Sequence, residues 1–119
     1  MDDTVRLLIA GGSADAAARV ARALEDEGFR PDGLEVSGPE SLAAALDGQR
    51  WDALIADLDV LWPEGHTPLE LVRSRGLDLP VLLLIDTLGV PAVTALMRAG
   101  ARDVLPKANL RPLAPALAR

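Results

Sequence analysis

The sequence contains no cysteine and only one histidine, His66. Without a thiol the chain can form no disulfide, no thiolate nucleophile and no cysteine-ligated zinc site. A single histidine cannot build a histidine-rich metal site by itself. We therefore expect His66 to be an exposed loop residue just ahead of a helix.

Aromatic residues and long apolar runs are also scarce. The only aromatic residues are Phe29, Trp51 and Trp62, which disfavours a platform for stacking nucleic-acid bases. The apolar run "VLLLI" at 81–85 is far too short to span a bilayer. The start "MDD" places acidic residues ahead of the first apolar run, the reverse of a secretory signal, so a cytoplasmic location is expected.

Charge narrows the class of partner. The formal net charge is -6 and the isoelectric point is near 4.6. An acidic chain is a poor match for a nucleic-acid backbone or an anionic membrane surface. We expect protein partners, with no direct contact to nucleic acid or membrane.

What the chain does have is a regular alternation of strand and helix patterns. With 119 residues, half of them apolar, it is long enough for one domain with its own core, spanning 1–119. Strands are predicted over 5–10, 33–37, 51–57, 80–85 and 101–106, and helices over 14–27, 40–47, 69–75, 90–99 and 109–119. Five such alternations with short connections predict a parallel sheet covered by helices on both faces.

Three helix starts carry capping signals. Ser37 with Glu40, and Thr67 with Glu70, have the spacing of a capping box. Asn109 is the predicted N-cap of the last helix.

Polar residues gather where the predicted strands end. The first strand is followed by Gly11 and Gly12, the third ends at Asp57 with Asp59 two residues on, the fourth is followed by Asp86 and Thr87, and the fifth by Lys107. In open parallel sheets, ligands bind outside the carboxyl ends of the strands. An Asp57–Lys107 ion pair at this rim is therefore expected, with Asp59 on the solvated side.

Three stretches in this order resemble receiver domains of two-component response regulators. They are "WDALIADLDV", "RSRGLDLPVLLLI" and "ALMRAGARDVLPKANLRPLAPAL", and the resemblance covers essentially the whole chain. It implies a flavodoxin-like, doubly wound α/β fold with a five-stranded parallel sheet in the order 2-1-3-4-5 and five helices. Asp57 then corresponds to the phosphoacceptor and Lys107 to the phosphate-contacting lysine. The chain would be a whole receiver-like domain, compatible with the N-terminal part of a longer bacterial signalling protein.

The sequence departs from that family where the chemistry is most demanding. Gly11 and Gly12 stand where receivers usually carry the two acidic residues that hold Mg²⁺. Ile85 replaces the usual serine or threonine, with Thr87 as a weak substitute two residues on, and Ala108 replaces a proline. Mg²⁺ needs several oxygen ligands and gives up water reluctantly. We therefore assign no metal ligand and no cofactor, with Mg²⁺ relevant only if the receiver is active.

These departures predict a pseudo-receiver that acts through protein contacts, with impaired phosphorylation at Asp57. It would not be an enzyme beyond self-phosphorylation and dephosphorylation at that residue. Its expected partners are a sensor kinase in a phosphorelay, its own output domain, or a second copy through the fourth-helix and fifth-strand face.

Two alternatives stay open at this point. One is a working receiver that phosphorylates Asp57 with unusual ligands such as Asp86 and water. The other is a phosphate or nucleotide module at the Gly11–Gly12 turn, where backbone N–H groups precede a helix. Asp15, in the first turn of that helix, is explained sufficiently by the helix dipole.

Overall fold

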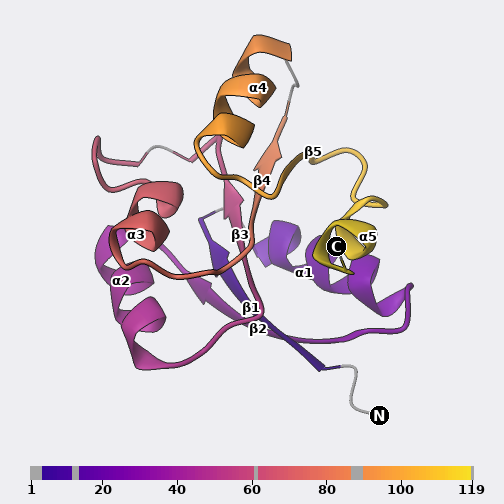
Figure 1. Ribbon diagram of the computed structural model, residues 1–119. Coiled ribbons are helices and arrows are strands. Elements are labelled where there is room, and N and C mark those ends of the chain that lie inside the picture. The colour runs from indigo at the N-terminus through magenta and orange to yellow at the C-terminus, as the bar shows by residue number, and fades with distance from the viewer. Residues whose placement is uncertain (1–3, 12–13, 61, 87–89, 119) are drawn as a thin grey trace.

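The computed structural model describes residues 4–11, 14–60, 62–86 and 90–118 (Figure 1). Strands and helices alternate along the whole chain. Their bounds are β1 Thr4–Ala10, α1 Ala14–Glu25, β2 Arg30–Val36, α2 Gly38–Gly48, β3 Ala53–Asp57, α3 Pro68–Ser74, β4 Val81–Ile85, α4 Val90–Arg98, β5 Asp103–Pro106 and α5 Leu113–Ala118. No helix among these described residues is long and apolar enough to cross a membrane.

The five strands form one parallel sheet in the order β2-β1-β3-β4-β5. This confirms the predicted fold class and strand order. The strand β3 lies in the middle, where Ala56 is in register with Ala10 of β1 and with Leu83 of β4. The carboxyl end of β3 therefore lies between the ends of two neighbouring strands, which is where a site in this kind of sheet is built.

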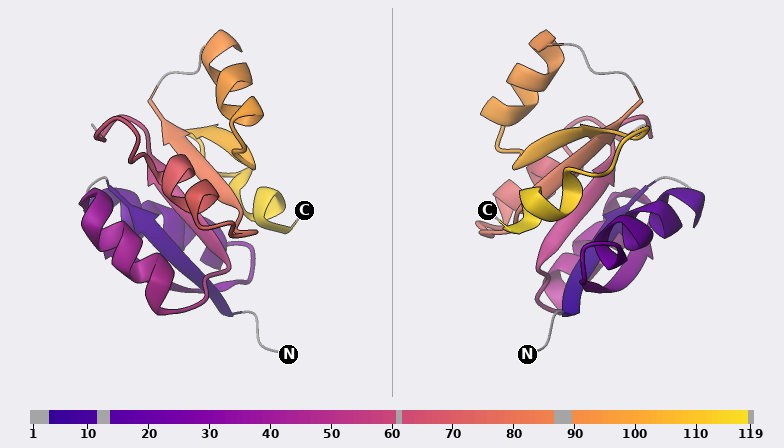
Figure 2. Two further views of the ribbon diagram at one scale, coloured as in Figure 1. Left: turned by 60° about the vertical axis from the view of Figure 1, so that its left-hand side comes forward. Right: turned by 90° about the vertical axis from the view of Figure 1, so that its right-hand side faces the viewer.

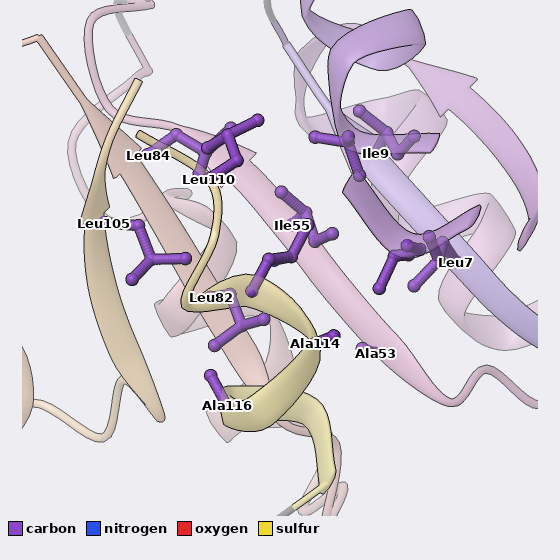
Figure 3. Packing of buried hydrophobic residues seen from close by; sticks show 13 residues of the cluster. Leu7, Ile9, Ala53, Ile55, Leu82, Leu84, Leu105, Leu110, Ala114 and Ala116 are labelled. Atoms are coloured by element: carbon purple, nitrogen blue, oxygen red, sulfur yellow. The ribbon is translucent and has the colours of Figure 1, made fainter. Parts of the chain in front are cut away.

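Helices cover both faces of the sheet, as Figures 1 and 2 show. One apolar cluster joins α1 and α5 to the sheet and includes Ile55, Leu82 and Leu113 (Figure 3). A second cluster joins α2 and α3 to the opposite face and includes Leu54 and Leu83. Because successive side chains of a strand point to opposite faces, "ALIAD" and "VLLLI" must be apolar at nearly every position. Together the two clusters fix the central strands and hence the rim at their carboxyl ends.

The edge strand β2 and the helix α4 are the least buried elements. Most of β2 is exposed, because it lies at the edge of the sheet. Figures 1 and 2 show α4 standing away from the rest of the helical layer, beyond the end of β4. Val93 and Leu96 of α4 are only partly buried, and Met97 is 42% exposed.

The two predicted capping boxes have different outcomes. The hydroxyl of Thr67 accepts a hydrogen bond from the Glu70 N–H, and the Glu70 carboxylate accepts one from the Thr67 N–H, so this box is confirmed. Ser37 makes no side-chain capping bond, so the prediction of a capping box at Ser37 and Glu40 is wrong. Gly38, the first residue of α2, has a positive φ of 83°, which departs from helical backbone and changes the geometry between Ser37 and the first turn.

The prediction that Asn109 caps a helix over 109–119 is also wrong, because α5 begins only at Leu113. The Asn109 side-chain oxygen accepts a hydrogen bond from the Arg111 N–H at 3.2 Å. This bond closes a short turn from Asn109 to Arg111. Such a bond between a side chain and the nearby backbone competes with helix formation. The helix α5 starts directly after Pro112, and proline suits the start of a helix because its φ is fixed near the helical value.

Candidate functional site at the carboxyl ends of the strands

Asp57 is the last residue of β3 and is only 7% exposed. Its Oδ1 lies 2.7 Å from Nζ of Lys107 and also accepts a hydrogen bond from the Asp59 N–H at 2.9 Å. Lys107 follows β5, and its N–H extends the β4–β5 ladder by donating to the Ile85 carbonyl at 2.9 Å. The structure thus brings together the two residues that the strand-end argument placed on one rim.

The same ammonium also contacts two further carboxylates. Asp59 Oδ2 lies 2.8 Å from Lys107 Nζ and accepts a hydrogen bond from the Asp86 N–H at 2.9 Å. The Asp86 carboxylate is 3.7 Å from the same nitrogen. Asp59 is on the rim, as expected, but its ion pair was not predicted from the sequence. One lysine therefore ties together the segments that follow β3, β4 and β5.

The sequence carries one signal for this arrangement, which is its use of lysine. Lys107 is the only lysine among the twelve basic residues, and all the others are arginine. An ammonium is a compact point charge that can serve several carboxylates at once, whereas a guanidinium is a planar fork. The single lysine of an arginine-rich chain thus stands at the point where three carboxylates converge.

The electrostatics of the cluster follow from these contacts. Burial by itself would lower the pKa of Lys107, but the hydrogen bonds to Asp57 and Asp59 outweigh it and raise that pKa well above its usual value. The hydrogen bond from Lys107 is the largest influence on the pKa of Asp59 and holds it below the usual range. Lys107 is therefore a permanent cation at neutral pH, and its single charge offsets part of the negative charge of the carboxylates around it.

A small cavity of about 150 Å³ opens beside the Asp57–Lys107 pair. Its walls are Asp15, Ala16, Arg19, Asp57, Leu84, Lys107 and Leu110. The sequence predicts Asp15 only as a residue that suits the helix dipole, and it gives no prediction for Arg19. The two lie four residues apart on α1, so they share one helical face, and that spacing was the signal available in the sequence. Arg19 also donates a hydrogen bond from Nη2 to the carbonyl of Lys107.

Gly11, directly after β1, faces the side chain of Val60. Its φ is 76°, its N–H donates to the Val36 carbonyl at 2.9 Å, and a Cβ added to it would lie 3.1 Å from Val60 Cγ2. Val60 therefore crowds the position that the Cβ of any side chain at position 11 would take. Within the described part of the chain, no group of three or more acidic, histidine or cysteine side chains is arranged to hold a metal ion.

Gly12 and Thr87 lie outside the described residues. Ile85 is half-buried at the end of β4, and His66 is exposed in the segment before α3, as expected.

Solved structures share this architecture along nearly the whole chain. The receiver domain of the Francisella response regulator 1452 superimposes with a TM-score of 0.78 at 16% identity, covering 96% of this chain and 93% of that one. The chain has the receiver-domain fold. The signal receiver domain of a signal transduction histidine kinase from Syntrophus aciditrophicus gives a TM-score of 0.68 at 26% identity, covering 97% and 88% of the two chains.

Receiver-like folds also occur outside proteins described as regulators or kinases. A pilus assembly-related protein from Burkholderia pseudomallei gives a TM-score of 0.71 at 24% identity, covering 99% of this chain and 92% of that one. No family model matches the sequence, and no curated protein matches it.

Proposed function

We propose that this receiver fold serves signal transduction as a pseudo-receiver, acting through protein contacts with impaired Mg²⁺-dependent phosphorylation at Asp57. The observation that carries the proposal is the pairing of Gly11 with Val60. A receiver usually places a metal-binding carboxylate after the first strand, and here a valine side chain stands against a glycine. The residues described in the structure thus offer a poor fit to Mg²⁺, which takes several oxygen ligands in a near-octahedral arrangement.

The charge balance at Asp57 supports the same proposal. Phosphoryl transfer brings anionic oxygens onto a carboxylate, and the repulsion must be offset by nearby cations. Lys107 is the cation in contact with Asp57, and Asp59 shares it at 2.8 Å. With one ammonium shared by these two carboxylates, the cluster keeps a net negative charge, and Lys107 has no charge left over for an incoming phosphoryl group.

A surface for protein contacts is available at α4 and β5. Val93 and Leu96 are partly buried and Met97 is 42% exposed, so α4 presents apolar area that the rest of the domain does not cover fully. An output domain, a sensor kinase or a second copy of the chain would cover it. A cytoplasmic location is part of the same proposal.

The proposal is tested by intact mass after incubation with acetyl phosphate, with and without Mg²⁺, on the wild type and on Asp57→Asn. We expect no adduct under conditions that label a phosphorylatable receiver run in parallel. A Mg²⁺-dependent adduct of one phosphoryl group that is absent from Asp57→Asn would contradict the proposal.

That same result would establish the second candidate, a working receiver. It has one specific observation in its favour, since Asp57 and Lys107 are 2.7 Å apart, the contact that phosphoacceptor chemistry uses. A titration with Mg²⁺, followed by tryptophan fluorescence, separates the two candidates independently. Saturable binding at low millimolar concentration would favour the working receiver.

A phosphate or nucleotide module at the Gly11–Gly12 turn has less support. The Gly11 N–H is engaged by the Val36 carbonyl, so it does not point at a bound anion. A thermal shift with phosphate and with nucleotides tests the idea directly, because a ligand that binds the native state must raise its melting temperature.

A further inference from the structure

Arg19 connects helix α1 to the lysine of the site. Its side chain leaves the exposed face of α1 and its Nη2 donates a hydrogen bond to the backbone carbonyl of Lys107, 88 residues away in the sequence. Arg19 also lines the cavity beside Asp57. A surface arginine would ordinarily be free to sample several rotamers, and here it spans from a helix to the loop that carries the key cation.

The hydrogen bond matters because of what else holds the Lys107 backbone. On its strand side, the Lys107 N–H is bound to the Ile85 carbonyl at 2.9 Å, as the last rung of the sheet. On its other side the chain enters a turn, in which the Asn109 N–H donates to the Pro106 carbonyl at 3.0 Å. The bond from Arg19 fixes the peptide plane between the strand and that turn.

The position of the ammonium depends on that peptide plane. Lys107 Nζ holds Asp57 Oδ1 at 2.7 Å and Asp59 Oδ2 at 2.8 Å, on a side chain with four rotatable bonds. A tilt of the backbone moves the far end of such a side chain by more than the tolerance of a short hydrogen bond. An anchored backbone therefore favours the double contact over alternatives in which the ammonium swings into water.

We propose that Arg19 is a positioning residue for Lys107, so that helix α1 sets how firmly the ammonium is held against Asp57 and Asp59. The inference goes beyond the proposed function, since it concerns the resting cluster and holds whether or not Asp57 accepts a phosphoryl group. It also gives α1 a direct mechanical link to the site, separate from its packing on the sheet.

The chain offers a specific readout, because Lys107 is its only lysine. Amine acylation at fixed pH, followed by peptide mapping, measures the accessibility of that one side chain and separates it from the terminal amine. In protein labelled with ¹⁵N-lysine, the ammonium gives a single resonance whose persistence reports how tightly it is held.

The variants are Arg19→Ala and, as a matched control, Arg22→Ala. Arg22 is an exposed residue on the same helix and lines a neighbouring groove, not the Asp57 cavity. Alanine is the best helix former, so neither change should unfold α1. Losing one solvent-exposed hydrogen bond should speed acylation of Lys107 about three- to tenfold in Arg19→Ala, with no change in Arg22→Ala. Arg19→Lys keeps a cationic donor but adds a second lysine, so it is read by peptide mapping alone, and it should restore part of the protection of the peptide that carries Lys107.

Two results would overturn the inference. The first is an acylation rate in Arg19→Ala equal to that of the wild type and of Arg22→Ala. The second is a rise that only matches the increase in the unfolded fraction measured by urea denaturation of the same variant. A faster rate at unchanged stability, together with a weakened ammonium resonance, would establish the positioning role.

Discussion

Removing the ammonium of Lys107 is the sharpest perturbation that the cluster allows. Lys107→Met keeps the length of the side chain and deletes the charge, leaving Asp57, which is 7% exposed, without its cation. Removing one partner of a fully buried ion pair costs roughly 3–5 kcal/mol, because the other charge is left uncompensated. The lysine side chain here is 21% exposed, so water can offset part of that loss, and we expect a cost of about 2–4 kcal/mol.

The pairwise interaction is isolated by adding Asp57→Asn. Alone, this change should cost about 1–2 kcal/mol, because Lys107 keeps its contact with Asp59 while the bonds from Lys107 and from the Asp59 N–H lose a charged acceptor. In the double variant the uncompensated carboxylate is gone, so the cost should be smaller than the sum by about 1–3 kcal/mol. Urea denaturation at pH 7, followed by circular dichroism, gives the four free energies of unfolding.

The exposed pair of Arg75 and Asp47 provides the control. It has a similarly short contact of 2.8 Å, but its side chains are 25% and 63% exposed. The same cycle there should give a much smaller coupling than the one between Lys107 and Asp57, because solvent screens an exposed pair. If the Lys107 and Asp57 substitutions were additive within about 0.5 kcal/mol, the burial argument for this site would be wrong.

Three further predictions follow from contacts outside that pair. The hydrogen bond from Lys107 lowers the pKa of Asp59, so the stability from this contact is complete above the unfolded-state pKa of about 3.9 and is lost as the pH falls through the lower folded-state pKa. Asp59→Asn should therefore flatten the dependence of the urea midpoint on pH in that acidic range, and the slope near neutral pH should not change. Thr67→Ala should cost about 1 kcal/mol in urea denaturation by removing a helix cap, whereas Ser37→Ala, where no capping bond exists, should stay within about 0.5 kcal/mol, and equal effects would contradict the assignment. Gly11→Asp should lower the free energy of unfolding by about 1–2 kcal/mol, because the backbone at position 11 has a positive φ that disfavours any side chain, and crowding by Val60 should add to this loss. Adding Val60→Ala should recover only the part that comes from crowding, as measured by urea denaturation of the single and double variants.

The fold was predictable from the sequence because its signals are local and repeat along the chain. Continuous apolar runs such as 81–85 indicate strands covered on both faces, and the alternation with helices leaves few topologies open. The Asp57–Lys107 contact was predictable for the same reason, since a parallel sheet delivers its strand ends to one rim. Helix starts were less predictable: the same spacing forms a capping box at Thr67 and none at Ser37.

The rest of the site depends on contacts between segments far apart in the sequence. That Arg19 reaches the Lys107 carbonyl follows from how α1 lies beside the segment after β5, and no periodicity encodes it. That Asp59 shares the lysine follows from the turn after β3, in which its own N–H binds Asp57. Such contacts are decided by loop conformation, which depends on tertiary packing more than on local propensity.

Gly11 and Val60 form a pair that constrains how this domain can change by mutation. With valine at position 60, any side chain at position 11 meets a neighbour at 3.1 Å on a backbone that already disfavours it. With a smaller residue at position 60 and glycine kept at position 11, the contact is simply lost. A substitution at position 11 is therefore costlier while valine is kept at position 60, so the effects of the two positions are not additive. A series of single substitutions that leads to an acidic residue at position 11 would pass through a less stable protein. Selection for stability therefore favours keeping Gly11.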